Sequence, residues 1–312
     1  MINKEKNFVS GVVYVHNAMC RVDKFLKALI ETFEGNFENS EIILVNDYSL
    51  DDTYDVITTV AKEATKTSIT IVNMSYFHGL ELAMNAGMDL AIGDFVFEFD
   101  NTVLDFDKEE IMKVYKRSLE GFDIVSASPD KKQKKSSDIF YNIFAKYSNI
   151  NGKMRTESFR VLSRRVINRI SSMNKTIPYR KALYANAGLK TDNLVYNVVP
   201  YEKDIVDITE KKYRSSLAAD SLILFTDVGY SFAKGMTITM IIVAMLVAIY
   251  SVIIYLVGTP VEGWTTTILF LAFSFFGLFG ILTIIIKYLQ ILVNLVFKRK
   301  SYNFESIEKI TK

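Results

Sequence analysis

Apolar and polar positions along the first 200 residues predict strands and helices in turn. Short apolar runs are typical of buried strands, whereas apolar residues spaced three and four apart predict amphipathic helices. The alternation predicts βαβ units, and so an α/β fold with a mostly parallel sheet and helices on both faces. The expected strands lie at 9–15, 41–45, 68–74, 94–100, 123–126 and 194–199, with helical patterns between them, including 22–33, 79–92 and 111–119.

Residues 236–297 are almost all apolar. Residues 236–257 carry no charged side chain, and residues 267–297 carry only Lys287. Each stretch reaches the roughly 20 residues that a helix needs to cross a bilayer, so two membrane spans are expected. Basic residues follow at 298–300, whereas the connector at 258–266 has no Lys or Arg. This bias predicts a cell-membrane protein whose soluble domain and both termini face the cytoplasm.

The sequence divides into three parts on this pattern. Residues 1–213 are expected to form a cytoplasmic domain, and residues 235–312 to hold the two spans and a basic tail. Residues 214–234 show an apolar helical face that suits either the membrane interface or the core of the soluble domain. Lys287 either marks the end of the hydrocarbon, snorkels, or faces the partner helix. The alternative for the two apolar stretches is a pair of buried core helices.

Charge and motif content exclude several functions. The net charge of +2 gives no reason to expect a nucleic-acid partner, and the single cysteine rules out a disulfide framework or a cysteine-based metal site. The two histidines, His16 and His78, lack metal-ligand spacing. No GxGxxG, Walker or GxSxG motif is present, so dinucleotide, NTPase and hydrolase functions lack support.

Polar side chains follow three of the expected strands at the point where each strand ends. They are His16-Asn17, Asn46-Asp47 and Asp100-Asn101-Thr102. In open α/β sheets, ligands collect at the carboxyl ends of strands. A carboxylate such as Asp100 can hold a divalent cation there, or the ribose or phosphate of a nucleotide. The sequence therefore predicts a nucleotide crevice, with an acidic solvated turn as the alternative for Asp100.

Several short motifs follow one another along the chain in an order that resembles a known family. VYVHN and VNDYSLDDT are followed by a helix beginning at His78-Gly79, by DNT, by FRVLSRR, by Lys212-Tyr213 and by a basic tail after the second apolar stretch. This order resembles the family 2 glycosyltransferases of GT-A fold. It is most similar to the membrane-anchored polyprenyl-phosphate glycosyltransferases, the GtrB and dolichol-phosphate-mannose-synthase-like group.

The resemblance implies roles for individual residues. Asp47 falls on the carboxylate that reads the nucleotide base, and Asp100 on the first position of the Asp-x-Asp motif, where Mg²⁺ or Mn²⁺ would be held. Arg160, Arg164 and Lys212 become candidates for the acceptor phosphate. The donor site would also include three polar residues that follow strand ends, His16, Asn17 and Thr102, together with Tyr14 in the first strand.

The implied function is sugar transfer from a nucleotide-sugar, expected to be UDP-linked, to polyprenyl (undecaprenyl) phosphate. The lipid bilayer is a further expected partner, and the two spans offer a surface for homo-oligomerisation. Two departures matter: Thr102 stands where the motif has its second Asp, and Ser158 stands where the family has an Asp. Either a cation is held differently, or Arg or Lys offsets the diphosphate charge, or turnover is lost. The alternative function is therefore a catalytically silent, membrane-anchored partner of surface-glycan enzymes.

Overall fold

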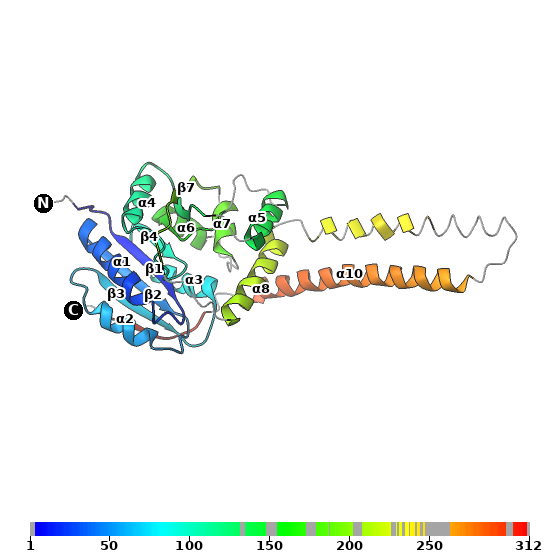
Figure 1. Ribbon diagram of the computed structural model, residues 1–312, viewed down its shortest axis with the longest axis horizontal. Helices are drawn as coiled ribbons and strands as arrows, with labels where there is room; N and C mark the ends of the chain where they lie inside the picture. Colours follow the sequence, from blue (N-terminus) through cyan, green and yellow to red (C-terminus); the bar gives the residue numbers. More distant parts are fainter. Residues whose placement is uncertain are drawn as a thin grey trace.

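The fold is an α/β sheet domain from which one long helix extends (Figure 1). The computed structural model describes residues 4–131, 135–147, 155–172, 179–186, 188–201, 208–225, 263–297 and 302–310, with scattered positions between 229 and 246. The strands are β1 (Val9–Val15), β2 (Ser40–Asn46), β3 (Ser68–Met74), β4 (Phe95–Phe99), β5 (Ile124–Pro129), β6 (Phe159–Ser163), β7 (Thr191–Tyr196) and β8 (Phe304–Lys309). The helices are α1 (Val22–Asn36), α2 (Thr53–Ala61), α3 (Leu80–Leu90), α4 (Glu109–Leu119), α5 (Lys135–Tyr147), α6 (Arg164–Ser172), α7 (Arg180–Asn186), α8 (Ile208–Phe225) and α10 (Trp264–Phe297).

The strands form one mixed sheet in the order β7-β5-β6-β4-β1-β2-β3-β8. β3, β2, β1 and β4 are joined by parallel pairing, and β5 pairs in parallel with β7. β6 runs antiparallel between β4 and β5, and β8 runs antiparallel along β3. The predicted α/β class is confirmed, but the sheet is mixed because these two strands oppose the others.

Helices cover both faces of the sheet, and each face has its own apolar core. On one face, α1, α2 and α4 pack through residues such as Phe25, Ile57 and Val114. On the other face, α3 and α6 pack on residues that include Val12 and Val45. Gly87 lets α3 approach the sheet closely, because a Cβ added there would lie 2.5 Å from Val12 Cγ1 and 2.7 Å from Val45 Cγ2. The burial of these side chains supplies the main driving force for folding.

The C-terminal segment completes the sheet, which the division of the sequence did not anticipate. β8 pairs with β3, and Tyr54 Oη donates a 2.6 Å hydrogen bond to Glu308. The backbone N–H of Asn303 donates to His78 Nε2 at 3.1 Å, and its carbonyl accepts from the Ser75 N–H at 3.2 Å. The residues that follow the last apolar stretch therefore belong to the sheet domain rather than to a separate tail.

α8 and α10 lie beside each other where α10 meets the sheet domain (Figure 1). Lys287 of α10 pairs with Asp220 of α8 at 2.8 Å. The partner helix expected for it was the other span, most of which lies outside the described residues, so its three predicted roles remain predictions. Over its described residues, no helix combines the length and hydropathy needed to cross a membrane. Most of the first predicted span, 236–257, lies outside the described residues. The two spans therefore remain a prediction.

Candidate active site

The three polar strand ends meet at one edge of the sheet, as predicted. Val15 at the end of β1 pairs with Asn46 at the end of β2, and Val13 pairs with Phe99 at the end of β4. The Asp47 N–H donates to the Val15 carbonyl at 2.8 Å, which continues the β1–β2 pairing past the strand end. Parallel strands point their carboxyl ends the same way, so these loops share one edge.

Asp47 is fully buried and bound by uncharged donors. Its Oδ1 accepts the backbone N–H of His78, and its Oδ2 accepts that of Gly79, both at 2.8 Å. Tyr14 Oη donates to Oδ2 at 3.1 Å. Burial raises the pKa of Asp47 above its ordinary value, and these donors offset the rise only in part. The carboxylate holds the start of α3 against β2, and the predicted contact with a nucleotide base remains a prediction.

His16 and Asn17 shape the loop after β1. His16 Nδ1 donates to the Asp47 carbonyl at 2.7 Å, because a carbonyl oxygen only accepts, and Asn17 Nδ2 then donates to His16 Nε2 at 3.2 Å. Asn17 has a φ of 44°, and its side chain accepts the Leu50 N–H at 2.9 Å. Tyr14, His16, Asn17 and Asp47 therefore form one linked group, as the donor-site prediction requires.

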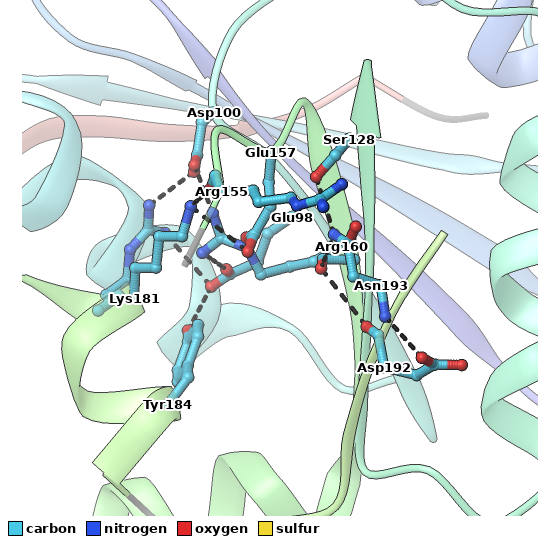
Figure 2. A network of polar contacts seen from close by, with 12 residues as sticks. Glu98, Asp100, Ser128, Arg155, Glu157, Arg160, Lys181, Tyr184, Asp192 and Asn193 are labelled. Atoms are coloured by element: carbon cyan, nitrogen blue, oxygen red, sulfur yellow. Dashed lines mark hydrogen bonds and ion pairs between the residues drawn. The ribbon is translucent and has the colours of Figure 1, made fainter. Parts of the chain in front are cut away.

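Asp100 stands in a different environment, a buried network of ion pairs. Figure 2 shows the carboxylates of Glu98, Asp100 and Glu157 gathered around Arg160 and Lys181. Arg160 contacts Glu98 at 2.9 Å and Asp100 Oδ2 at 2.6 Å, and its Nε lies 3.1 Å from Glu157. Lys181 lies 3.4 Å from Glu157. Burial alone would raise the pKa of Asp100, but the neighbouring guanidinium groups hold it below its ordinary value.

Arg180 completes this network and was missed from the sequence. It is the first residue of α7, it is 1% exposed, and it contacts Glu81 at 2.9 Å, Glu98 at 3.3 Å and Asp100 Oδ1 at 2.7 Å. Glu81 belongs to the first turn of α3, two residues after Gly79, so Arg180 links the Asp47 group to the Asp100 group. No local pattern marks Arg180, because its partners come from α3, β4 and the loop after β4.

Thr102 and the two carboxylates that follow it in the chain, Asp105 and Asp107, are each bound by other groups of the protein. Thr102 Oγ1 accepts a hydrogen bond from Arg21 Nε at 2.7 Å. Asp105 accepts the Tyr196 hydroxyl at 2.7 Å, and Ser158 Oγ donates to it at 3.4 Å. Asp107 accepts the Glu109 N–H at 3.0 Å and thereby caps α4.

The three candidates for the acceptor phosphate separate in space. Arg160 is 3% exposed and already paired with carboxylates. Arg164 donates to the carbonyls of Ala91 and Gly93, which precede β4, so it lies at the opposite end of β4 from Asp100, roughly 16 Å away along the strand. Lys212 is exposed on α8, and its neighbour Tyr213 packs over Gly79. The structure therefore places the neighbour of Lys212 beside Gly79 and places Arg164 at the opposite end of β4.

The donor groups at this edge do not fit a divalent cation. Both Asp100 oxygens are bound by guanidinium groups, and Thr102 offers a hydroxyl where the motif has a carboxylate. Hard cations such as Mg²⁺ bind several oxygen ligands that include carboxylates. Within the described part of the chain, no group of three or more His, Cys, Asp or Glu residues could hold a metal ion.

Comparison with known proteins decides the family. Residues 10–176, more than half of the chain, match the family described as Glycosyl transferase family 2. The chain belongs to this family. The family resemblance seen in the motifs is thereby confirmed.

Curated relatives match about 40–62% of this chain. It is 27% identical over 198 residues to an uncharacterised glycosyltransferase of Synechocystis sp., covering 62% of this chain and 61% of that protein. It is 28% identical over 194 residues to the prophage bactoprenol glucosyl transferase homolog of Escherichia coli, covering 60% of this chain and 62% of that one. An undecaprenyl-phosphate 4-deoxy-4-formamido-L-arabinose transferase of Pseudomonas syringae is 30% identical over 127 residues, 40% of this chain and 37% of that protein. The chain thus matches about 60% of the length of the first two relatives.

A solved structure shares the fold. The mannosyltransferase PcManGT from Pyrobaculum calidifontis, solved in complex with GDP-Man and Mn²⁺, has a TM-score of 0.50 at 14% identity, covering 89% of this chain and 88% of that one. This similarity supports a GT-A fold for the present chain. The cation in that complex belongs to that protein.

Proposed function

We propose that this glycosyltransferase moves a sugar from a UDP-linked donor to polyprenyl (undecaprenyl) phosphate at the cytoplasmic face of the cell membrane. The observation that carries the proposal is the meeting of the three polar strand ends at one edge of the sheet. Ligands of such sheets bind at this edge. The relatives named bactoprenol glucosyl transferase and undecaprenyl-phosphate transferase support a polyprenyl phosphate as acceptor.

Attachment to a bilayer through two spans is part of the proposal. Large apolar side chains of α10, including Leu271, Phe275, Leu282 and Leu289, are exposed to the surroundings. A bilayer would cover such side chains, whereas water would not. α8 packs beside the sheet domain and β8 is a strand of its sheet, and α10 lies between them in the chain. A chain that leaves this domain into the bilayer must therefore return to the same side, which requires an even number of membrane crossings. Homo-oligomerisation through these helices remains a prediction.

The proposed reaction needs little general-base catalysis. A phosphate oxygen of the acceptor, which is already anionic, attacks the anomeric carbon of the sugar, and the bond from that carbon to the diphosphate oxygen breaks. The nucleoside diphosphate leaves with the electron pair, and no proton needs to move. Catalysis then depends on positioning and on stabilising the leaving charge. We assign Lys212 to the acceptor phosphate because it is the exposed cation among the three candidates and because its neighbour Tyr213 packs against Gly79, just before α3.

The test uses the full chain in detergent with radiolabelled UDP-glucose, UDP-galactose, UDP-N-acetylglucosamine and GDP-mannose, each with and without undecaprenyl phosphate. We expect one donor to place label in the lipid fraction only when the acceptor is present. Lys212→Ala should raise the acceptor KM roughly tenfold, as the loss of a charge-assisted hydrogen bond predicts. Lys27→Ala, an exposed lysine on α1, is the matched control and should leave the rate unchanged. Absence of labelled lipid with every donor would overturn the proposal.

The silent binding protein is kept as the second candidate because of one observation. Both oxygens of Asp100 are engaged by arginines in the present conformation, so the charge of the motif carboxylate is already compensated within the protein. A chain that binds a nucleotide yet labels no lipid with any donor would favour this second function.

A further inference from the structure

We infer that the donor diphosphate is held without a divalent cation, by the guanidinium of Arg21 at the Thr102 position. This inference rests on the proposed function, because it concerns the same donor site. It follows from which groups occupy the Asp-x-Asp segment and from what each group is already bound to.

Asp100 is the only carboxylate of the DNT segment, and it is fully committed. Arg160 binds its Oδ2 at 2.6 Å, and Arg180 binds its Oδ1 at 2.7 Å. Each of these arginines also contacts Glu98, and both are buried. A cation on Asp100 would have to displace a guanidinium and then lie beside two buried positive charges. Leaving buried charges uncompensated in this way is strongly unfavourable.

Arg21 stands where a positive charge is needed. It immediately precedes α1 and follows the loop that begins with His16 and Asn17. Its Nε donates to Thr102 Oγ1 at 2.7 Å, so its guanidinium bridges the loop after β1 and the loop after β4. These are two of the three loops at the proposed donor edge. The charge therefore lies across the strand ends that would face the diphosphate.

The chemistry of the two side chains suits this arrangement. A guanidinium presents a planar set of N–H donors that matches phosphate oxygens, and it stays protonated throughout the physiological range. Thr102 is neutral, so it places no negative charge beside an incoming diphosphate. When the bond between the anomeric carbon and the diphosphate breaks, Arg21 offsets the charge that gathers on the leaving oxygen. Arg21 would exchange its present contacts for the phosphate.

The first experiment measures nucleotide binding, so that it does not depend on turnover. The full chain in detergent is titrated with UDP and with GDP, in EDTA and then in MnCl₂. We expect one nucleotide to bind with dissociation constants that agree within about twofold between the two conditions. Arg21→Ala should weaken binding roughly tenfold to a hundredfold, as the loss of charge-assisted hydrogen bonds predicts. Lys27→Ala, on the helix that Arg21 immediately precedes, should bind as the wild type does.

The second experiment restores the second carboxylate of the Asp-x-Asp motif at position 102. In the double variant Arg21→Ala/Thr102→Asp, we expect nucleotide binding to become dependent on Mn²⁺, with a bound-Mn²⁺ signal in electron paramagnetic resonance that the wild type lacks. Wild-type binding that needs Mn²⁺ would overturn the inference, and so would cation-free binding that Arg21→Ala leaves unchanged. Absence of binding by either nucleotide in any condition would instead count against the proposed function itself.

Discussion

Two carboxylates, one fully buried and one partly buried, lie at the same edge of the sheet and are held in opposite ways. Asp47 follows β2, Asp100 follows β4, and β1 lies between them. Asp47 is bound by two backbone N–H groups and a tyrosine hydroxyl, and burial raises its pKa. For Asp100, burial acts in the same direction, but Arg160 and Arg180 outweigh it and lower the pKa.

The difference shows that main-chain donors hold Asp47, whereas charged side chains hold Asp100. The donors of Asp47 are mostly main-chain groups, so its geometry follows from the path of the chain into α3. Asp100 depends on charged side chains from β6 and α7, in a cluster of four carboxylates (Glu81, Glu98, Asp100, Glu157) and three cations (Arg160, Arg180, Lys181). Removal of one cation leaves buried negative charge, whereas removal of one neutral donor costs a single hydrogen bond.

The largest expected effect comes from Arg180→Ala. The cluster would keep four carboxylates with two cations, and loss of one partner from a buried charge network costs about 3–5 kcal/mol. The measurement is the free energy of unfolding of the full chain in detergent, by urea denaturation. Arg165→Ala is the control, because Arg165 is 74% exposed and its pair with Asp123 should contribute about 0–1 kcal/mol. Equal losses in the two variants would show that the Asp100 network does not carry the stability assigned to it.

Gly79→Ala examines the Asp47 side. Gly79 has a φ of 81°, and a Cβ there would lie 2.3 Å from the Tyr213 ring of α8. Gly121 has a φ of 91° with nothing near its added Cβ, so Gly121→Ala carries the backbone strain alone. We expect Gly79→Ala to lower the free energy of unfolding by about 1–3 kcal/mol more than Gly121→Ala does, because overpacking adds to the strain. Similar losses would mean that α8 moves aside without cost.

Opposite pH dependence is expected for Asp47→Asn and Asp100→Asn. Asp100 has a lowered folded pKa, so its contribution is present above the ordinary value of about 3.9 and is lost as the pH falls through the folded pKa. Asp47 has a raised folded pKa, so its contribution is present below about 3.9 and is lost as the pH rises through the folded pKa. From about pH 7 to about pH 3, the stability lost in Asp47→Asn should grow, and that lost in Asp100→Asn should shrink.

Melting temperatures of the wild type and both variants at each pH supply this comparison. If the stability loss changed with pH in the same direction in both variants, the opposite pKa shifts of Asp47 and Asp100 would be contradicted. Each variant serves as the control for the other, because both replace an Asp at the same sheet edge with its amide.

The smallest effect is expected for Tyr14→Phe, which removes only the hydroxyl that donates to Asp47. Two backbone donors remain on the carboxylate, so the loss should be about 0.5–1.5 kcal/mol, the usual contribution of one hydrogen bond. The free energy of unfolding by urea is again the measurement. A loss as large as that in Arg180→Ala would show that Asp47 depends on side chains as much as Asp100 does.

Local patterns in the sequence were sufficient for the parallel half of the fold and for the edge that carries the candidate site. The strand runs and the polar residues after them lie close together in the chain, so His16, Asp47 and Asp100 could be assigned to one edge before any contact was known. The right-handed βαβ connection imposes that arrangement. The family motifs, which also depend on local order, agreed with it.

Only the tertiary structure decided which side chains those residues meet. Arg180 reaches Asp100 from 80 positions away, and β8 pairs with β3 across most of the chain. Arg164, close to Arg160 in sequence, lies at the other end of β4 because β6 runs antiparallel to it. Ion pairs and edge-strand pairing depend on which surfaces meet after the sheet has formed, and the spacing of residues along a chain does not encode that.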